Sequence, residues 1–276
     1  MVNSEIIEYI ERVPINHGRR SDIYKLSNER VLKLYLPDFP KAKIEQEFTN
    51  ALLVYEQTKI ATPRPIKLAT EGARTGIVFQ AIEGQSYMDI FQANPIKYFT
   101  QAKKLAMVQD QISVNNVSGI PTQQQSFNRL LTGSNRLTDD QKAVLLKVLS
   151  TNNANKLCHG DFHHGNVLHS LNDADYVIDW MDAFVGDPLL DIALTAVNAA
   201  VSNAPSHVPI FYRNLYETLK KVMALDARVI SLHEEIDQTK IPQYLALAAG
   251  IHLARFDGEN SRSHKSYFEK IMSKIK

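Results

Sequence analysis

The spacing of apolar residues changes at residues 83–85, and this change constrains the fold more than any other feature of the sequence. Before it, short alternating runs bounded by turn residues are typical of strands. These runs cover residues 22–26, 31–35, 66–70 and 76–82. One helix is expected among them, because apolar residues recur at helical spacing over residues 41–59.

The remainder of the chain has mainly helical spacing. The expected helices cover residues 95–112, 124–131, 138–149, 188–201, 208–225, 241–256 and 263–275. One of them opens with a capping box, Thr138 at the cap and Gln141 three residues later. The sequence therefore predicts an α+β fold with two lobes. A small antiparallel-sheet lobe with one main helix covers residues 1–82, and a larger, mostly helical lobe covers residues 83–276. Clefts between two such lobes are common ligand sites.

The composition argues against several classes of function. The net charge of the 276 residues is only +1, so no strong field of one sign favours a nucleic acid or a membrane as partner. No window approaches the roughly 18 apolar residues needed to span a bilayer. The first 13 residues carry acids within their apolar pattern, unlike a signal peptide. Cys158 is the single cysteine, so no disulfide can form within the chain. We expect a cytoplasmic protein, and nothing implies a protein partner.

The segment from Cys158 to Asn166, CHGDFHHGN, gathers three histidines, an aspartate and an asparagine around two glycines. It admits three interpretations. The first is a polar turn without chemistry, since His and Asn are common in loops. The second is a metal site formed by His159, Asp161, His163 and His164. The third is a loop for phosphoryl transfer, which needs a carboxylate to orient the acceptor and oxygen ligands for magnesium.

The third interpretation fits the spacing of the polar residues. Asp161 and Asn166 are five positions apart, as are the base and the metal-binding amide of protein kinases. Asp179 follows the β-branched pair Val177-Ile178, where a strand would place a metal ligand at its end. The oxygens of Asn166 and Asp179 suit Mg²⁺ rather than zinc.

Two long motifs resemble the aminoglycoside phosphotransferase and choline kinase-like family, which is related to the protein kinases. HGDFHHGNVL, from His159, is similar to its H-G-D-x-x-x-x-N catalytic loop, and VIDWMDAFVGDPLLDIA, from Val177, to its I-D-W-x-x-x-x-x-G-D-P-x-x-D-L-A block. The resemblance implies a bilobal protein-kinase-like fold. It implies Asp161 as the catalytic carboxylate, Asn166 and Asp179 as ligands of Mg²⁺, and ATP or GTP as donor.

The resemblance extends to the first lobe. The segment starting at Gly18 is similar to the family's phosphate-covering loop, in which Gly18 and Ser21 would meet the nucleotide phosphates. Lys33, inside an apolar strand, would contact the α- and β-phosphates. Its partner would be a glutamate of the following helix. Glu45 and Glu47 diverge by about 200° around that helix, so only one can face the strand, and Glu47 borders the apolar face more closely.

Two further sets of residues are implied. Backbone groups around Gln80 to Ile82, at the hinge, would contact the adenine. His159, Asp187 and Asp191 would support the catalytic loop, with Asp187 as the N-cap of a helix that starts at Pro188. His163 and His164 replace family positions often held by proline or lysine.

The acceptor is not specified by the sequence. A cationic acceptor would need acids after the Asp179 block, and Asp182 is the best placed of these. The other candidates are Glu217, Glu234, Glu235, Asp237, Asp257 and Glu259. Tyr244, His252 and Phe256 lie at helical spacing and could line a pocket, but a packing stripe is the preferred interpretation of that spacing.

The sequence thus predicts a kinase that phosphorylates a hydroxyl of a small metabolite or antibiotic. Two alternatives remain. One is a kinase-like module that binds nucleotide without catalysis. The other is an enzyme that phosphorylates polypeptides, although only seven residues separate Asp179 from Asp187 and no recognisable activation segment lies between them.

Overall fold

The chain groups into two units, each built from segments that are separated in sequence. The structure is a computed structural model that describes residues 13–18, 20–93, 97–151, 154–202, 229–233, 236–255 and 261–275. Unit 1 comprises Met1–Pro95, Val117–Ile120 and His164–Ala183, and unit 2 comprises Ile96–Asn116, Pro121–His163 and Phe184–Lys276. Unit 1 thus also takes in residues 83–95, 117–120 and 164–183, which the sequence analysis assigned to the second lobe.

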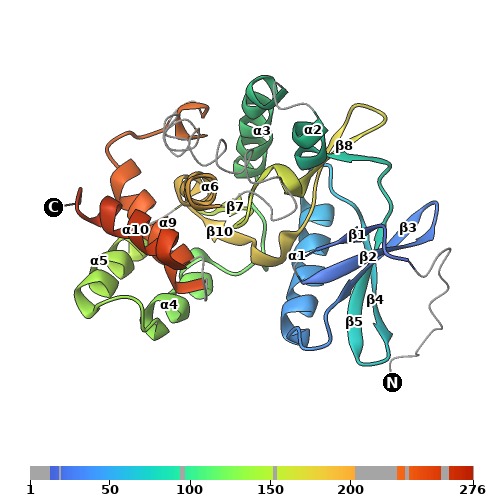
Figure 1. Cartoon of the computed structure of the whole chain (residues 1–276), viewed down its shortest axis with the longest axis horizontal. Coiled ribbons are helices and arrows are strands. Elements are labelled where there is room, and N and C mark those ends of the chain that lie inside the picture. Colours follow the sequence, from blue (N-terminus) through green and yellow to red (C-terminus); the bar gives the residue numbers. More distant parts are fainter. Residues whose placement is uncertain are drawn as a thin grey trace. The chain divides into compact units, whose positions relative to one another are not determined.

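A five-stranded antiparallel sheet forms the first part of unit 1 (Figure 1). Its strands are β1 (Asn16–His17), β2 (Ser21–Ser27), β3 (Arg30–Tyr35), β4 (Pro65–Glu71) and β5 (Arg74–Gln80), in the order β1-β2-β3-β5-β4. Each strand from β2 to β5 contains one of the predicted alternating runs or overlaps it closely. At Gly76, β5 approaches β3 so closely that a Cβ would lie 2.6 Å from the Lys33 carbonyl oxygen.

The alternation of side chains along β3 gives the two faces of the sheet different environments. Leu32 and Leu34 pack with Val78 of β5 in one apolar cluster. Tyr35 belongs to a second cluster with Ile44 of helix α1 (Lys41–Gln57), which contacts β4 and β5. Lys33 lies between Leu32 and Leu34, so the period of two directs its side chain to the face that carries Tyr35 and α1.

The second part of unit 1 is a smaller antiparallel sheet of β6 (Gly84–Ser86), β8 (Val167–Ser170) and β9 (Asp175–Val177). It is accompanied by helix α2 (Tyr87–Ala93) and by two 3₁₀ turns, η1 (His164–Asn166) and η2 (Trp180–Asp182). The sequence did not predict α2. The Val177 amide donates to the Ala61 carbonyl at 2.8 Å, and the Trp180 indole N–H donates to the Thr62 hydroxyl at 2.9 Å. These bonds attach residues 164–183 to the segment that precedes β4.

Unit 2 is mostly helical, as predicted. Its elements are α3 (Lys97–Ser113), α4 (Gln123–Gly133), α5 (Asp139–Ser150), β7 (Lys156–Cys158), β10 (Phe184–Gly186), α6 (Pro188–Val201), α9 (Ile241–Arg255) and α10 (Ser261–Met272). α9 packs against both α6 and α10, and its residues contribute to a buried core with Phe127, Leu145, Leu190 and Phe268. The predicted capping box at Thr138 is present. The expected helix at residues 208–225 lies outside the described residues. Within the described part of the chain, no helix has the length and apolarity required to cross a membrane.

Candidate functional site

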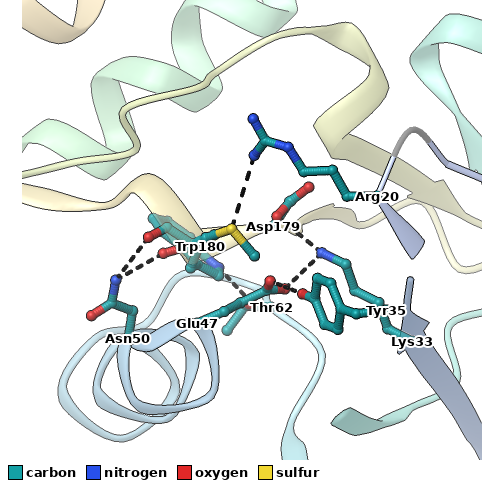
Figure 2. A network of polar contacts seen from close by, with 9 residues as sticks. Arg20, Lys33, Tyr35, Glu47, Asn50, Thr62, Asp179 and Trp180 are labelled. Atoms are coloured by element: carbon teal, nitrogen blue, oxygen red, sulfur yellow. Dashed lines mark hydrogen bonds and ion pairs between the residues drawn. The ribbon is translucent and has the colours of Figure 1, made fainter. Parts of the chain in front are cut away.

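Lys33 and Glu47 form a buried ion pair in unit 1. The Lys33 ammonium donates to Glu47 Oε1 at 2.7 Å, and the Glu47 side chain is only 1 % exposed (Figure 2). Glu45 points elsewhere, since its carboxylate is half exposed and lies 3.7 Å from the Lys41 ammonium on the same helix. The prediction that Glu47 rather than Glu45 pairs with Lys33 is confirmed, and it follows from the helical turn between positions two apart.

Asp179 completes a three-membered charge cluster with this pair. Lys33 also donates to Asp179 Oδ1 at 3.0 Å, so its ammonium lies between two carboxylates (Figure 2). The backbone of Asp179 is left-handed, with φ 68° and ψ 59°, a conformation that costs a residue with a Cβ about 1–2 kcal/mol. Strained backbone conformations of this kind are typical of functional positions, where the surrounding contacts hold the residue in place.

Charge and burial act in opposite directions on the Lys33–Glu47 pair. Burial tends to lower the pKa of Lys33, but the charges of Asp179 and Glu47 outweigh it, and the pKa stays well above its ordinary value. Burial raises the pKa of Glu47, and the charge of Asp179 adds to this effect, while Lys33 opposes it. Lys33 is therefore a permanent cation at neutral pH, and its charge opposes the effect of burial on Glu47.

Three neighbours support this cluster and were not predicted from the sequence. The Tyr35 hydroxyl donates to Glu47 Oε2 (Figure 2). The Asn50 side-chain amide donates to the Trp180 carbonyl at 3.0 Å, which ties α1 to the residue after Asp179. The Arg20 guanidinium contacts the Met181 sulfur at 4.0 Å. The sequence did not indicate that Tyr35, Asn50 and Arg20 belong to this site, because nothing in their spacing relates them to Glu47 or to Asp179.

Asn166 and Asp179 end the same hairpin. β8 begins at Val167, which pairs with Val177 of β9, and the Ile178 amide donates to the Asn166 carbonyl at 3.0 Å. The hairpin therefore brings the amide of Asn166 and the carboxylate of Asp179 to one end. One carboxylate and one amide oxygen fit Mg²⁺, which prefers a few protein oxygens and keeps its other positions for phosphates and water. No group of three or more His, Cys, Asp or Glu side chains suited to a metal occurs among the described residues, so the histidine-rich cage is not found there.

The predicted catalytic loop, with Asp161, lies in unit 2, where Asp191 of α6 holds its backbone. Asp191 is 3 % exposed and accepts from the Gly160 amide at 2.7 Å and the His159 amide at 3.1 Å. Gly160 has φ 79°, which a glycine adopts without the strain of a side chain. His159 is fully buried, and its Nδ1 accepts from the Asp161 amide at 3.3 Å. Asp191 and His159 therefore fix the chain on both sides of Gly160.

Asp187 is the N-cap of α6, as predicted. Its Oδ1 accepts from the Leu189 amide at 2.9 Å, with Pro188 at the first helical position. Its Oδ2 accepts from the Tyr244 hydroxyl at 2.6 Å. Tyr244 and His252 of α9 are both buried. Their burial agrees with the packing stripe that the sequence analysis preferred to a pocket.

Gly18 lies in the turn between β1 and β2, and Ser21 is the first residue of β2. The Gly18 amide donates to the Ser21 carbonyl at 2.8 Å, and Ser21 is buried. Arg74 holds the strand that follows by donating to Asp22 Oδ2 at 2.7 Å and to the Tyr35 carbonyl at 2.7 Å. The turn is thus closed by main-chain hydrogen bonds, and its base is fixed to β3.

The predicted hinge has one backbone N–H that remains available. The Gln80 amide donates to the Arg64 carbonyl at 2.9 Å and the Ala81 amide to the Glu29 carbonyl at 2.8 Å. Among the described residues, none accepts from the Ile82 amide. The Ile82 amide is thus one main-chain donor in this segment, and the adenine contacts of the backbone around Gln80 to Ile82 stay a prediction.

The acceptor candidates are only partly described. Asp182 ends η2, three residues after Asp179, and its side chain is half-buried. Asp237 is exposed and accepts from the Thr239 hydroxyl in a local turn, so it has the role of a surface residue. The remaining candidates lie outside the described residues: Glu217, Glu234, Glu235, Phe256, Asp257 and Glu259.

Comparison with known proteins agrees with this fold and these motifs. Residues 122–233 match the model of the phosphotransferase enzyme family (APH). No curated protein matched in a sequence search. The structure is similar to a thermostable mutant of the aminoglycoside phosphotransferase APH(4)-Ia in ternary complex with AMP-PNP and hygromycin B, with a TM-score of 0.64 at 14% identity over 97% of this chain and 94% of that one.

Two further solved structures have the same fold. The choline kinase LicA from Streptococcus pneumoniae gives a TM-score of 0.61 at 15% identity, and the GDP and kanamycin complex of the aminoglycoside phosphotransferase APH(2")-IIia gives 0.58 at 15% identity. Each comparison covers 98% of this chain and 95% of the other. The predicted fold class is therefore confirmed: the chain has the protein-kinase-like fold of these phosphotransferases.

Proposed function

We propose that the chain is a small-molecule kinase, which transfers the γ-phosphate of ATP or GTP to a hydroxyl of a small metabolite or antibiotic. The family match and the structural neighbours support a phosphotransferase of this kind. The single observation that carries the proposal is the cluster in which Lys33 contacts Glu47 and Asp179. An ion pair with a purely structural role needs only one carboxylate, and Glu47 supplies it. The second carboxylate, Asp179, has a strained backbone, and this points to a ligand that Lys33 and Asp179 would bind together.

Lys33 has the properties of a phosphate-binding cation. It is permanently charged, and Glu47 fixes the direction of its ammonium on β3. Because the transition state of phosphoryl transfer is loose, positioning and charge stabilisation supply most of the rate. Gly18 in the turn before β2 and Ser21, the first residue of β2, would add hydrogen bonds to the phosphates. The Ile82 amide would donate a hydrogen bond to the base of the nucleotide.

Asn166 and Asp179 would hold Mg²⁺. When bound, the ion supplies positive charge to the phosphate oxygens during transfer. The Lys33 ammonium contacts the Asp179 carboxylate at 3.0 Å, and with that carboxylate engaged as a metal ligand we would expect the ammonium to be directed to the phosphates instead.

Asp161 would orient the acceptor hydroxyl and take its proton late in the transfer. A loose transition state needs little help from a strong base, so the placement of the carboxylate matters more than its basicity. The hydrogen bonds of Asp191 and His159 to the backbone of this loop are the means by which that placement is held.

The donor, acceptor and location belong to the same proposal. Neighbours with AMP-PNP and with GDP support either an adenine or a guanine nucleotide. Neighbours with hygromycin B and kanamycin, and a choline kinase, support polar and often cationic acceptors, which Asp182 would help to bind. We propose a cytoplasmic location, where ATP is abundant and the thiol of Cys158 stays reduced.

The experiment that tests the proposal measures consumption of ATP and GTP over a panel of aminoglycosides, macrolides, amino alcohols and sugar metabolites. We expect one acceptor class to stimulate turnover. Asp179→Ala and Asp161→Ala should each lower that turnover by about 100-fold or more without loss of fold.

The chain provides a matched control for Asp179. Asp173 also has a left-handed backbone, with φ 63°, but its side chain is 89% exposed in the turn of the β8–β9 hairpin. Asp173→Ala should leave turnover unchanged. Equal activity of the Asp179→Ala and Asp173→Ala variants would show that the metal-binding assignment is wrong. Magnesium-dependent nucleotide binding without turnover of any acceptor would favour the silent nucleotide-binding module, and phosphorylation of a polypeptide would favour the protein kinase alternative.

A further inference from the structure

Tyr35 lies two residues after Lys33 on β3 and therefore on the same face of the sheet. Its side chain is 1 % exposed. Its hydroxyl donates to Glu47 Oε2, while the Lys33 ammonium donates to Glu47 Oε1 (Figure 2). Each oxygen of the Glu47 carboxylate thus has its own donor, and both donors come from one strand.

The ring of Tyr35 is fixed by its packing contacts, so it can hold the hydroxyl in place beside Glu47. It stacks on Phe39 with centroids 4.9 Å apart and planes inclined by 23°, and it belongs to the apolar cluster of Ile44 and Ile77. The Lys33 ammonium lies 5.4 Å from the centre of the same ring, within the range of a cation–π contact. Tyr35 consequently touches both members of the Lys33–Glu47 pair.

The hydroxyl is a fixed donor at any physiological pH. Burial raises the pKa of Tyr35, since its ionised form would be desolvated beside two carboxylates. A buried carboxylate with one donor per oxygen cannot rotate about its terminal bond without losing a charge-assisted hydrogen bond. A glutamate with Lys33 alone could rotate and present either oxygen, and the position of the ammonium would become less defined.

We propose that Tyr35 is a positioning residue for phosphoryl transfer, acting through Glu47 to hold the Lys33 ammonium in the direction of the nucleotide phosphates. The inference rests on the proposed function, because it assigns a task to a residue of the same site. Tyr35 makes no contact with a reacting group in this role. Its effect on catalysis passes through the carboxylate of Glu47.

The test is Tyr35→Phe, which removes only the hydroxyl and keeps the ring in its stack. Loss of a hydrogen bond to a charged group corresponds to about a 10-fold effect or more. We expect that loss in kcat/KM for the nucleotide, with KM for the acceptor and the affinity for adenosine unchanged, because neither depends on Lys33.

Two comparisons separate positioning from a general structural role. In the Glu47→Gln background, Tyr35→Phe should cause no further loss of kcat/KM, since the two side chains act as one unit. Tyr55→Phe removes an exposed hydroxyl from α1, the helix that also carries Glu47, so its kinetics should match those of the wild type.

The outcomes are distinct for the two proposals. If the wild-type enzyme is active and Tyr35→Phe behaves like Tyr55→Phe, the positioning role is refuted and the proposed function stands. Additive losses from Tyr35→Phe and Glu47→Gln would equally refute action through Glu47. A wild-type protein that neither binds nucleotide nor phosphorylates any acceptor would overturn the proposed function, and this inference with it.

Discussion

Replacing Asp191 should destabilise unit 2 by an amount that its hydrogen bonds allow us to estimate. The carboxylate is buried and accepts from three donors, the Gly160 amide at 2.7 Å, the His159 amide at 3.1 Å and the Gln109 side-chain amide at 3.1 Å. Gly160 bonds to Oδ1, whereas His159 and Gln109 share Oδ2. An asparagine at this position keeps the shape of the side chain but turns one acceptor into a donor.

In the Asp191→Asn variant, the NH₂ group of the new side chain would best take the place of Oδ1, which faces Gly160. Only the hydrogen bond from Gly160 is then lost, whereas the opposite orientation would lose the bonds from both His159 and Gln109. A hydrogen bond to a charged group contributes about 1.5–3 kcal/mol, and a buried donor left without a partner costs a similar amount. We therefore expect Asp191→Asn to lower the free energy of unfolding by about 2–4 kcal/mol, and Asp191→Ala by about 3–5 kcal/mol. In a protein of this size, a loss of about 3 kcal/mol corresponds to a decrease in Tm of roughly 6–12 °C.

Urea titration followed by circular dichroism measures this change. Asp139→Asn is the control, since Asp139 is fully exposed in the first turn of α5 and its loss should change stability by less than about 1 kcal/mol. If Asp191→Asn unfolds at the same urea concentration as Asp139→Asn, the hydrogen bonds to residues 159 and 160 do not stabilise the loop and the reasoning fails. At a temperature where Asp191→Asn stays folded, its turnover should still fall, because the backbone that carries Asp161 loses a support.

Two further predictions concern pH and phosphate binding. Burial lowers the pKa of His252 to about 3, so below about pH 6.5 the unfolded chain binds a proton that the folded chain does not, and the wild type should lose about 1.4 kcal/mol for each pH unit. The stability difference from His252→Gln, measured by urea titration between about pH 7 and pH 5, should narrow as the pH falls, and parallel pH curves would contradict this. Among the described residues no carboxylate pairs with Arg20, whose guanidinium contacts only the Met181 sulfur and the face of Phe39. Titration calorimetry should show that Arg20→Ala weakens the affinity for AMP-PNP but not for adenosine, while the exposed Arg129→Ala changes neither; equal losses for both ligands would exclude phosphate recognition by Arg20.

The sequence predicted those parts of the site that depend on periodicity. The resemblance to the kinase-like family supplied the expectation of a lysine–glutamate pair, and the helical turn of α1 then selected Glu47 over Glu45 as the partner of Lys33. The Pro188 start identified Asp187 as a cap. Both are local rules, in which a residue's direction follows from its neighbours in the chain.

Contacts between distant segments could not be predicted in this way. Tyr35 reads as one more apolar residue of a strand, and its role depends on the depth at which the Glu47 side chain is buried. Asn50 and Thr62 bind groups of η2 more than 100 positions later. No periodic signal records such a distance, because the pairing is decided by the packing of β8 and β9 beside the segment that precedes β4.

The distribution of unit 1 along the chain limits how the protein can be divided. A fragment that stopped at Pro95 would contain Lys33 and Glu47 but not Asp179, and its helix α1 would lose the surface that covers Asn50. Unit 1 therefore cannot be expressed, exchanged or permuted as one continuous stretch of the gene, because Val117–Ile120 and His164–Ala183 also belong to it.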